Sequence, residues 1–488
     1  MSDELNTNKG KWSLVVLRVS QTTAKVWVGT LFHTLKMPDQ AYVELIKPDG
    51  SRVRKNIVKK NWDRPFRYVR KRFYTTVEFE DLEPGTHYEV EFVRRTEAIH
   101  HEVEEWQTLR QGQFDTLPAA VPANGERPFT VALGSCFYAH RDGGQAAGSY
   151  RALYERGPEH VRPHVTFLTG DQVYLDIGFD SLSFVKSEIR DRVAGDYAEH
   201  WQLLGSILSR GATWMLPDDH EYWNDYPFHD SLVPTLLALK LDFVRNTWEK
   251  ASRDGVTRVQ QCPRVETFAL EELSFCLADL RSWRSDDDFL PEKDFKELTR
   301  WAEGLTGPGV LAIPQPLIVK PNSLERNLMS YKQQYRTLLK ALGSTGHDIV
   351  VLSGDVHFGR IASTTLGPKG GKLVEVIASP MSNLTFLNGV ATSTPDLKPG
   401  KFPHPDVRID GWTPAPVECS ESAAVSIRQG FPLSAYPKDR TREHFMTAGF
   451  RRAAGGGIEL NVDAWRVRDR DDANLPRRDF DTFSVTLS

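Results

Sequence analysis

The sequence is poor in cysteine and has no long apolar run. Its 488 residues include four cysteines, none of them in a C-x-x-C pair. This usage excludes a disulfide scaffold, so reduced thiols are expected. No apolar stretch reaches the roughly 18 residues that a membrane-spanning helix needs. The N-terminal stretch contains neither an apolar signal core nor a twin-arginine pair, and we therefore expect a cytoplasmic protein without a membrane span.

A large excess of charge of either sign is also absent. The 61 basic and 65 acidic residues leave a formal net charge of −4. At this balance we do not expect specific binding of nucleic acid, because such binding relies on basic surfaces. The short basic run RYVRKRF at 67–73 is expected to form the solvated face of a strand. The length indicates more than one domain and a large core.

The N-terminal part of the chain has the pattern of antiparallel strands. Short β-branched and alternating segments recur between residues 12 and 117. The turn DLEPGTHYEVEF resembles a corner of fibronectin-type and immunoglobulin-like sandwiches, in which a Pro-Gly-Thr turn leads into a strand with Tyr88. We therefore predict a β-sandwich domain over 1–117, followed by a linker rich in Pro, Ala and Gly over 118–127.

From residue 128 onward, apolar strands alternate with helical segments. Helices are predicted at 149–156, 181–193, 196–210 and 234–251. The alternation predicts a layered α/β (α+β) domain over 128–488, which antiparallel strands from His444 onward complete. The segment 392–440, with many Pro, Ser and Asp residues, is predicted to be an irregular surface excursion.

Possible metal ligands follow four apolar strands, in the motifs GSC, GDQVY, DDHEYWND and GDVH. Ligand sites in open α/β sheets lie beyond the carboxyl ends of strands, so these four loops should converge. Each residue alone has an ordinary alternative as a small core cysteine, a helix-capping aspartate or a packed tyrosine. Crowded carboxylates are costly to bury without a cation, and the four clusters together therefore predict a metal site.

In this order the motifs resemble those of the calcineurin-like metallophosphoesterases, which run GD, GNH(E/D) and GHxH. The closer resemblance is to the alkaline phosphatase D (PhoD-like) branch. In that branch Ser-Cys replaces the opening D-x-H, GD extends to GDxxY, GNHE becomes DDHE, and the last motif is GDxH. LADLRSWR at 277–284 and ASPMS at 378–382 also resemble this branch, and the resemblance covers about 128–390. It implies a metallophosphoesterase-type domain that hydrolyses phosphate monoesters or diesters.

The resemblance also implies a centre of Fe(3+) and Ca(2+). The ligands that it implies are Cys136, Asp171, Tyr174, Asp219, Asn224, Asp355 and His357. A thiolate and a phenolate suit ferric iron, Asp171 would bridge the two ions, and the oxygens of Asp219 and Asn224 would suit calcium. Such a pair can hold phosphate oxygens and supply the hydroxide that attacks phosphorus.

Three residues are expected to face the phosphate ester substrate. His220 aligns with a histidine that faces the leaving group in the wider superfamily, so we expect it to be the general acid. The alternative is that His220 binds the metals or supports their ligands. Asn224 and Gln172 are predicted to contact substrate, Gln172 standing where an arginine could hold phosphate.

Two functions of other kinds compete with the hydrolase. The chain could be a non-catalytic binding protein that a metal stabilises, which full metal occupancy with zero turnover would indicate. It could also be a metal-dependent nuclease, which the mild acidity of the chain disfavours.

Overall fold

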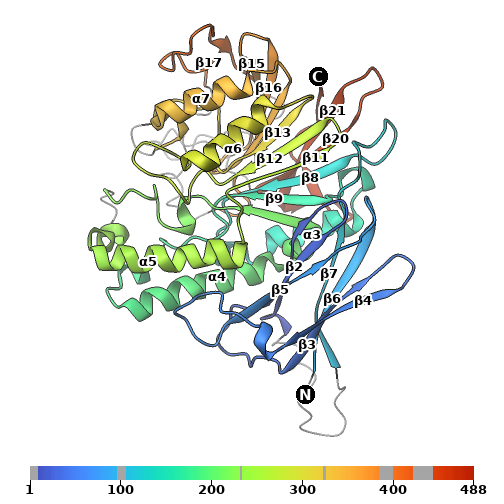
Figure 1. The fold of residues 1–488 in the computed structure, drawn as a ribbon, viewed down its shortest axis with the longest axis vertical. Coiled ribbons are helices and arrows are strands. Elements are labelled where there is room, and N and C mark those ends of the chain that lie inside the picture. The colour runs from blue at the N-terminus through green and yellow to red at the C-terminus, as the bar shows by residue number, and fades with distance from the viewer. Residues whose placement is uncertain are drawn as a thin grey trace.

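The computed structural model describes residues 9–95, 106–177, 179–230, 234–322, 326–383, 399–420 and 443–488. The first seven strands form two antiparallel sheets, of order β1-β2-β5 and β4-β3-β6-β7 (Figure 1). Their inner faces enclose Trp12, Val43 and Phe92, as alternating strands of a sandwich should. The strands are β1 (Ser13–Val19), β2 (Ala24–Thr30), β3 (Gln40–Ile46), β4 (Arg52–Val58), β5 (Phe73–Phe79), β6 (His87–Arg95) and β7 (Trp106–Asp115).

Backbone hydrogen bonds join the sandwich to the rest of the protein. The Gln113 N–H donates to Ser209 O at 2.9 Å, and the Gly211 N–H donates to Gln113 O at 2.8 Å. The basic run at 67–73 lies where the sandwich meets the rest of the protein. Arg67, Tyr68, Arg70 and Lys71 are exposed, as expected, but the expectation that the run forms a strand was wrong. β5 begins only at Phe73, and Arg67 Nε donates to the buried carboxylate of Asp254 at 2.7 Å. The run therefore forms part of the contact between the two regions.

Beyond the sandwich, two seven-stranded sheets pack face to face. The first has order β10-β9-β8-β20-β21-β22, with β23 paired to β21, and the second has order β11-β12-β13-β14-β16-β15-β19. Strands β8, β9 and β10 are parallel, as are β12, β13, β14 and β16. Phe129 and Phe167 of the first sheet contact Phe275 of the second, with ring centroids 5.7 and 6.5 Å apart.

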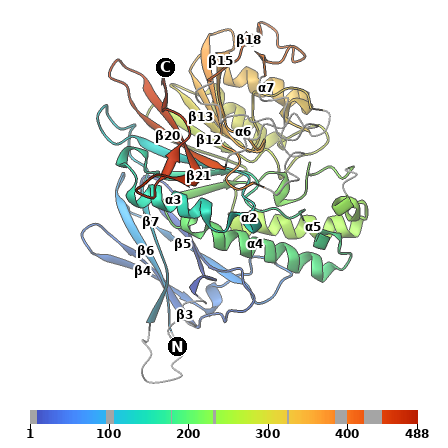
Figure 2. The same ribbon diagram turned by 180° about the vertical axis from the view of Figure 1, so that it is seen from behind.

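Helices cover the outer face of each sheet (Figures 1 and 2). Helices α3 (Gln145–Arg156), α4 (Lys186–Leu208) and α5 (Asp242–Asp254) pack on the first sheet, and α6 (Glu292–Glu303) and α7 (Lys332–Leu342) on the second. The result is a helix–sheet–sheet–helix arrangement. The helices predicted at 181–193 and 196–210 are one helix, because Gly195 is accommodated inside α4 with open space beside it.

The remaining elements have the following bounds. The first sheet contains β8 (Phe129–Gly134), β9 (Val165–Thr169), β10 (Ala212–Leu216), β20 (His444–Arg452), β21 (Ile458–Arg470), β22 (Pro476–Arg478) and β23 (Phe483–Leu487). The second contains β11 (Val265–Leu270), β12 (Leu273–Ala278), β13 (Gly309–Ala312), β14 (Ile349–Ser353), β15 (Arg360–Leu366), β16 (Gly371–Ile377) and β19 (Glu418–Cys419). Short elements are α2 (Ala139–Asp142), β17 (Lys401–Phe402) and β18 (Ala415–Pro416).

Two expectations concern the surface of the molecule. Much of the predicted irregular segment 392–440 lies outside the described residues, and its described part includes β19, which pairs with β15 in the second sheet. Within the described ranges, none of the helices has both the length and the apolar character needed to cross a bilayer.

Candidate metal centre

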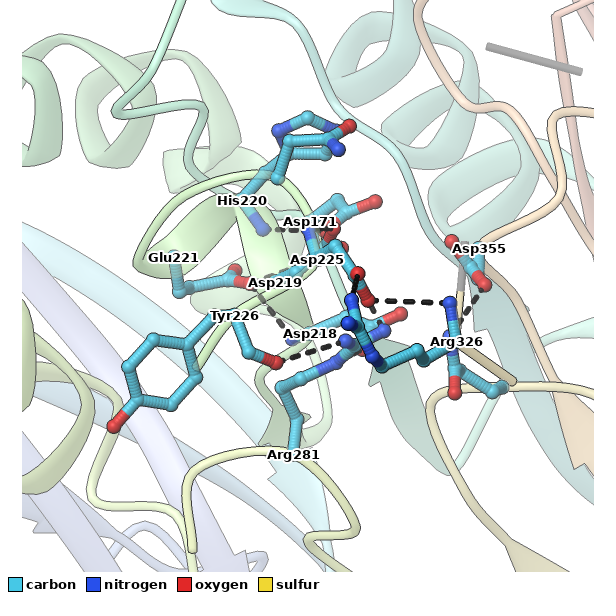
Figure 3. A network of polar contacts seen from close by, with 12 residues as sticks. Asp171, Asp218, Asp219, His220, Glu221, Asp225, Tyr226, Arg281, Arg326 and Asp355 are labelled. Atoms are coloured by element: carbon cyan, nitrogen blue, oxygen red, sulfur yellow. Dashed lines mark hydrogen bonds and ion pairs between the residues drawn. The ribbon is translucent and has the colours of Figure 1, made fainter. Parts of the chain in front are cut away.

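The loops after β8, β9, β10 and β14 converge at the carboxyl ends of these strands, as the motifs predicted. The Cys136 N–H donates to Gly170 O at 3.1 Å, and the Phe137 N–H to Asp171 O at 2.8 Å, which joins the first two loops. The loop after β10 is joined to the second, since the His220 N–H donates to Asp171 Oδ1 at 3.3 Å. Figure 3 shows the side chains of Asp171, Asp218 and Asp219 together with that of Asp355 from the loop after β14.

Potential ligand atoms form three overlapping groups, in each of which all atoms lie within 4.8 Å of one another. The groups are Cys136, Asp171 and His357; Asp171, Asp219 and His220; and Asp171, Asp218, Asp219 and Asp355. Asp171 belongs to all three groups, so its carboxylate lies where one residue could contact two cations. Predicted ligands from all four loops are thus brought together.

Backbone strain is concentrated at the same positions. Ten non-glycine residues of the described chain have positive φ, and four of them are predicted ligands. Their φ values are 54° at Cys136, 58° at Asp171, 71° at Asp355 and 56° at His357. Such conformations cost on the order of 1–3 kcal/mol each and recur at functional sites. The strain turns these side chains to a common point instead of continuing each strand.

Cys136 is fully buried among polar atoms. Its thiol lies 3.4 Å from Asp171 Oδ2, and the Ser379 hydroxyl donates to Sγ at 3.2 Å. Burial, and then the charge of Asp355, raise the pKa of the Cys136 thiol to about 12. The thiolate therefore requires a nearby cation, which would lower this pKa by electrostatic attraction.

Tyr174 and His357 lie beside Cys136 and contact each other. The Tyr174 hydroxyl lies 3.1 Å from His357 Nε2, while His357 Nδ1 lies 3.2 Å from Asn383 Oδ1. Burial raises the pKa of Tyr174 well above its usual value and lowers that of His357 to about 4, so this imidazole is neutral. With Nδ1–H donating to Asn383, the lone pair on Nε2 faces the centre, as a metal ligand requires.

Within the three ligand groups, two buried carboxylate oxygens lack a hydrogen-bond partner. They are Asp218 Oδ2 and Asp219 Oδ1, although Arg281 Nε donates to the other oxygen of Asp218 and Arg281 Nη2 lies 3.8 Å from Asp219 Oδ1. Burial raises the pKa of Asp218 to about 7, and burial together with these two aspartates raises that of Asp355 well above its usual value. Unpartnered buried carboxylates are unfavourable, and a cation would complete them. The residues present therefore fit a multivalent metal.

Glu221 holds two of the ligand loops together. Its carboxylate accepts hydrogen bonds from the N–H groups of Asp171, Gln172 and Val173 after β9, and of Asp218 after β10, at 2.7–3.3 Å. Sequence reasoning assigned this glutamate no role, although the DDHE motif contains it. Its place in the fold is to position the backbone of the metal-ligand loops.

His220 is oriented by a residue that the sequence analysis missed. Its Nδ1 lies 2.7 Å from Asp176 Oδ1, and its ring lies over Tyr174 with centroids 4.4 Å apart. The N–H of Asn224 donates to the other oxygen of Asp176 at 2.8 Å, which places Asn224 beside this pair. Burial alone would lower the pKa of His220, but Asp176, Asp219 and Asp171 raise it well above its usual value. The only sequence signal for Asp176 was its place five residues after Asp171.

Gln172 does not lie where the substrate-contact prediction put it. Its side chain is 1% exposed, its Nε2 donates to Leu216 O at 3.1 Å, and its Oε1 accepts from Gln260 at 2.9 Å. Both ends of the amide are thus engaged beneath the loop after β9. The side chain therefore links that loop to Leu216 at the end of β10 and to Gln260.

Comparison with known proteins gives a likeness of fold. No family model matches the chain, and no curated protein matches its sequence. The solved purple acid phosphatase PPD1 from yellow lupin (Lupinus luteus) seeds is 10% identical, with a TM-score of 0.55 over 97% of this chain and 74% of its own. The sensor domain of the anti-sigma factor RsgI4 from Pseudobacteroides cellulosolvens matches 22% of this chain and 93% of its own, at 14% identity and a TM-score of 0.16.

The chain therefore has a fold like that of the lupin purple acid phosphatase, and two antiparallel sheets form a sandwich at its N-terminal end. The likeness to the lupin protein at 10% identity concerns the fold. The chemistry has to come from the side chains of this protein.

Proposed function

We propose that this protein is a metal-dependent hydrolase of phosphate esters of the alkaline phosphatase D (PhoD-like) type. The observation that carries the proposal is the set of three ligand groups that share Asp171 at the carboxyl ends of β8, β9, β10 and β14. The lupin protein of similar fold is by name a phosphatase, which agrees with this reading. The order of the four motifs supports the PhoD-like branch in particular.

The donor set suits two different cations. Cys136, Tyr174 and His357 offer sulfur, phenolate and imidazole ligands that fit Fe(3+), and Asp219 and Asn224 offer oxygens that fit Ca(2+). Asp171 and Asp355 would complete the coordination. When bound, the cations would neutralise phosphate oxygens and promote attack by water on phosphorus.

We assign His220 as the general acid that protonates the leaving group. The hydrogen bond from Nδ1 to Asp176 fixes the ring, and this leaves Nε2 as the nitrogen able to give a proton to the departing oxygen. The side chain is 12% exposed, so a substrate can reach it. His220 also lies within ligand distance of Asp171 and Asp219, which is the geometry of the alternative metal-binding role.

A His220→Ala variant distinguishes the two roles. If His220 is the general acid, hydrolysis of alkyl phosphate esters should fall by about 10²- to 10⁴-fold. Hydrolysis of nitrophenyl esters should change little, because nitrophenolate departs without a proton, and the metal content should equal that of the parent. His33→Ala, at an exposed position in the sandwich, is the matched control.

Loss of metal from the His220→Ala variant, or an equal fall with both kinds of ester, would assign His220 to metal binding instead. Zero turnover by the parent protein at full metal occupancy would contradict the hydrolase itself.

A further inference from the structure

A second polar cavity lies away from the candidate metal centre. It has a volume of about 620 Å³ and is formed by helix α3, by the hairpin between β21 and β22, and by Arg210. Figure 2 shows α3 beside β21, and the two elements are in contact. Arg210 precedes β10 whereas Asp218 follows it, so strand β10 separates the arginine from the metal ligands. No predicted metal ligand lines this cavity.

The lining is basic because of how α3 is patterned. Ser149, Tyr150 and Leu153 are buried, and the opposite face presents Arg151 and Arg156 to the cavity. Arg151 and Arg156 are five positions apart, and Gly148, Ala152 and Glu155 of the same helix also line the cavity. At Gly148, which also lines the cavity, an added Cβ would lie 3.5 Å from Arg470 Nη2, an ordinary van der Waals contact, and this places the guanidinium beside the helix.

Two of the guanidinium groups are held in place by other protein groups. Arg156 donates to the carbonyl oxygens of Ala473 and Asn474 at 3.2 and 3.1 Å, which fixes it against the hairpin. Arg210 donates to Ser206 O at 3.1 Å and to Glu155 Oε1 at 2.5 Å. Carbonyl partners orient a guanidinium without neutralising it.

The positive charge of the cavity is not balanced by the protein. Four arginines face it with one carboxylate, that of Glu155, which pairs with Arg210. Over the ranges that the structure describes, Arg151, Arg156 and Arg470 have no carboxylate within the 4.0 Å of an ion pair. The lining therefore has a net charge of +3 in a chain whose formal net charge is −4.

We propose that this cavity binds an anion with a diphosphate group, either inorganic or as part of a nucleotide. One guanidinium group can donate two parallel hydrogen bonds to a phosphate group. Arginines from three elements can therefore bind a diphosphate more tightly than a single phosphate. The volume is that of a small-molecule site and exceeds what a single phosphate fills. A ligand here would join α3, the hairpin and the start of β10, away from the reacting groups.

Calorimetric titration of the full-length protein with methylenediphosphonate tests the proposal, because this diphosphate analogue is not hydrolysed. The parent protein should bind one molecule per chain. Arg151→Gln combined with Arg470→Gln should weaken binding by about 100-fold, at roughly tenfold per lost charge-assisted contact. The matched control, Lys293→Gln combined with Arg300→Gln, removes the same charge from exposed positions on α6 and should bind like the parent.

The analogue could also bind cations at the metal centre, so the titration is repeated with Asp171→Asn. Binding should persist there if the arginine cavity is the site. Loss of binding in Asp171→Asn, equal affinity in the double arginine variant, equal loss in the control, or no binding by the parent would each overturn the proposal. Tighter binding of α,β-methylene-ADP than of methylenediphosphonate would identify a nucleotide, and equal affinity would identify the diphosphate group alone.

Discussion

Glu221→Gln should weaken the junction between the loops after β9 and β10. One oxygen of Glu221 accepts from the N–H groups of Gln172 and Val173, and the other accepts from those of Asp171 and Asp218. Glutamine offers one acceptor oxygen, and its NH₂ group would face two N–H donors. Two hydrogen bonds are lost at about 1–2 kcal/mol each, a total of about 2–4 kcal/mol.

The size of the effect on thermal unfolding follows from the length of the chain. An unfolding entropy of about 2.1 cal/mol/K per residue gives roughly 1 kcal/mol/K for 488 residues that unfold together. The variant should therefore unfold about 2–4 °C below the parent. Scanning calorimetry at pH 8 measures this, because that pH lies above the value of about 7 to which burial raises the pKa of Glu221.

Metal content should fall in the same variant, because the backbone that carries Asp171 is no longer fixed. Glu292→Gln, at an exposed position on α6, is the matched control and should leave both measurements unchanged. A Glu221→Gln protein with the melting temperature and metal content of the parent would refute the role of Glu221 as the residue that positions these loops.

Three further predictions concern other residues. Asp171→Asn and Asp355→Asn should each lower bound metal, since an amide is a poorer ligand than a carboxylate; unchanged stoichiometry in both would show that the site is misplaced. Burial lowers the pKa of His164 to about 3, so the folded protein should lose stability as the pH falls below about 6.5, by up to about 2 kcal/mol at pH 5. His164→Asn should remove that part of the acid sensitivity in urea titrations at pH 7 and 5, and an unchanged pH dependence would count against it. Asp254→Asn removes a buried acceptor of Arg67 and should destabilise the protein by about 1–3 kcal/mol, whereas an unchanged urea midpoint would mean that this contact does not hold the sandwich.

The sequence predicted the ligand loops because each follows an apolar strand with a short polar motif. Cys136, Asp171, Asp219, Asp355 and His357 are all in the ligand groups. The loops after β8, β9 and β10 meet because these strands are parallel neighbours in the first sheet. Asp355 and His357 follow β14 of the second sheet, and they reach the centre because the two sheets pack face to face. The roles assigned to each residue stay predictions. The partners of these residues were not predicted, because a carboxylate that accepts backbone N–H groups has no spacing rule of its own.

Strands were missed where the usual pattern is weak, and pairings were missed where the partner is distant in the chain. β4 exposes every residue except Ile57, so its polar sequence does not read as a strand. β13 has only four residues, too few to show a period. β20 lies next to β8 although about 300 residues separate them in the chain, and no local pattern specifies such a neighbour. The packing of two sheets could not be foreseen for the same reason.

Elemental analysis of protein purified without chelators, with parallel assays on 4-nitrophenyl phosphate and bis(4-nitrophenyl) phosphate, tests the central claim most directly. The account predicts stoichiometric iron and calcium, visible charge-transfer colour from the Cys136 or Tyr174 ligands, and turnover that chelation abolishes and the two metals restore. A protein that hydrolyses neither ester at full metal occupancy, or one that remains active and colourless without iron and calcium, would contradict it.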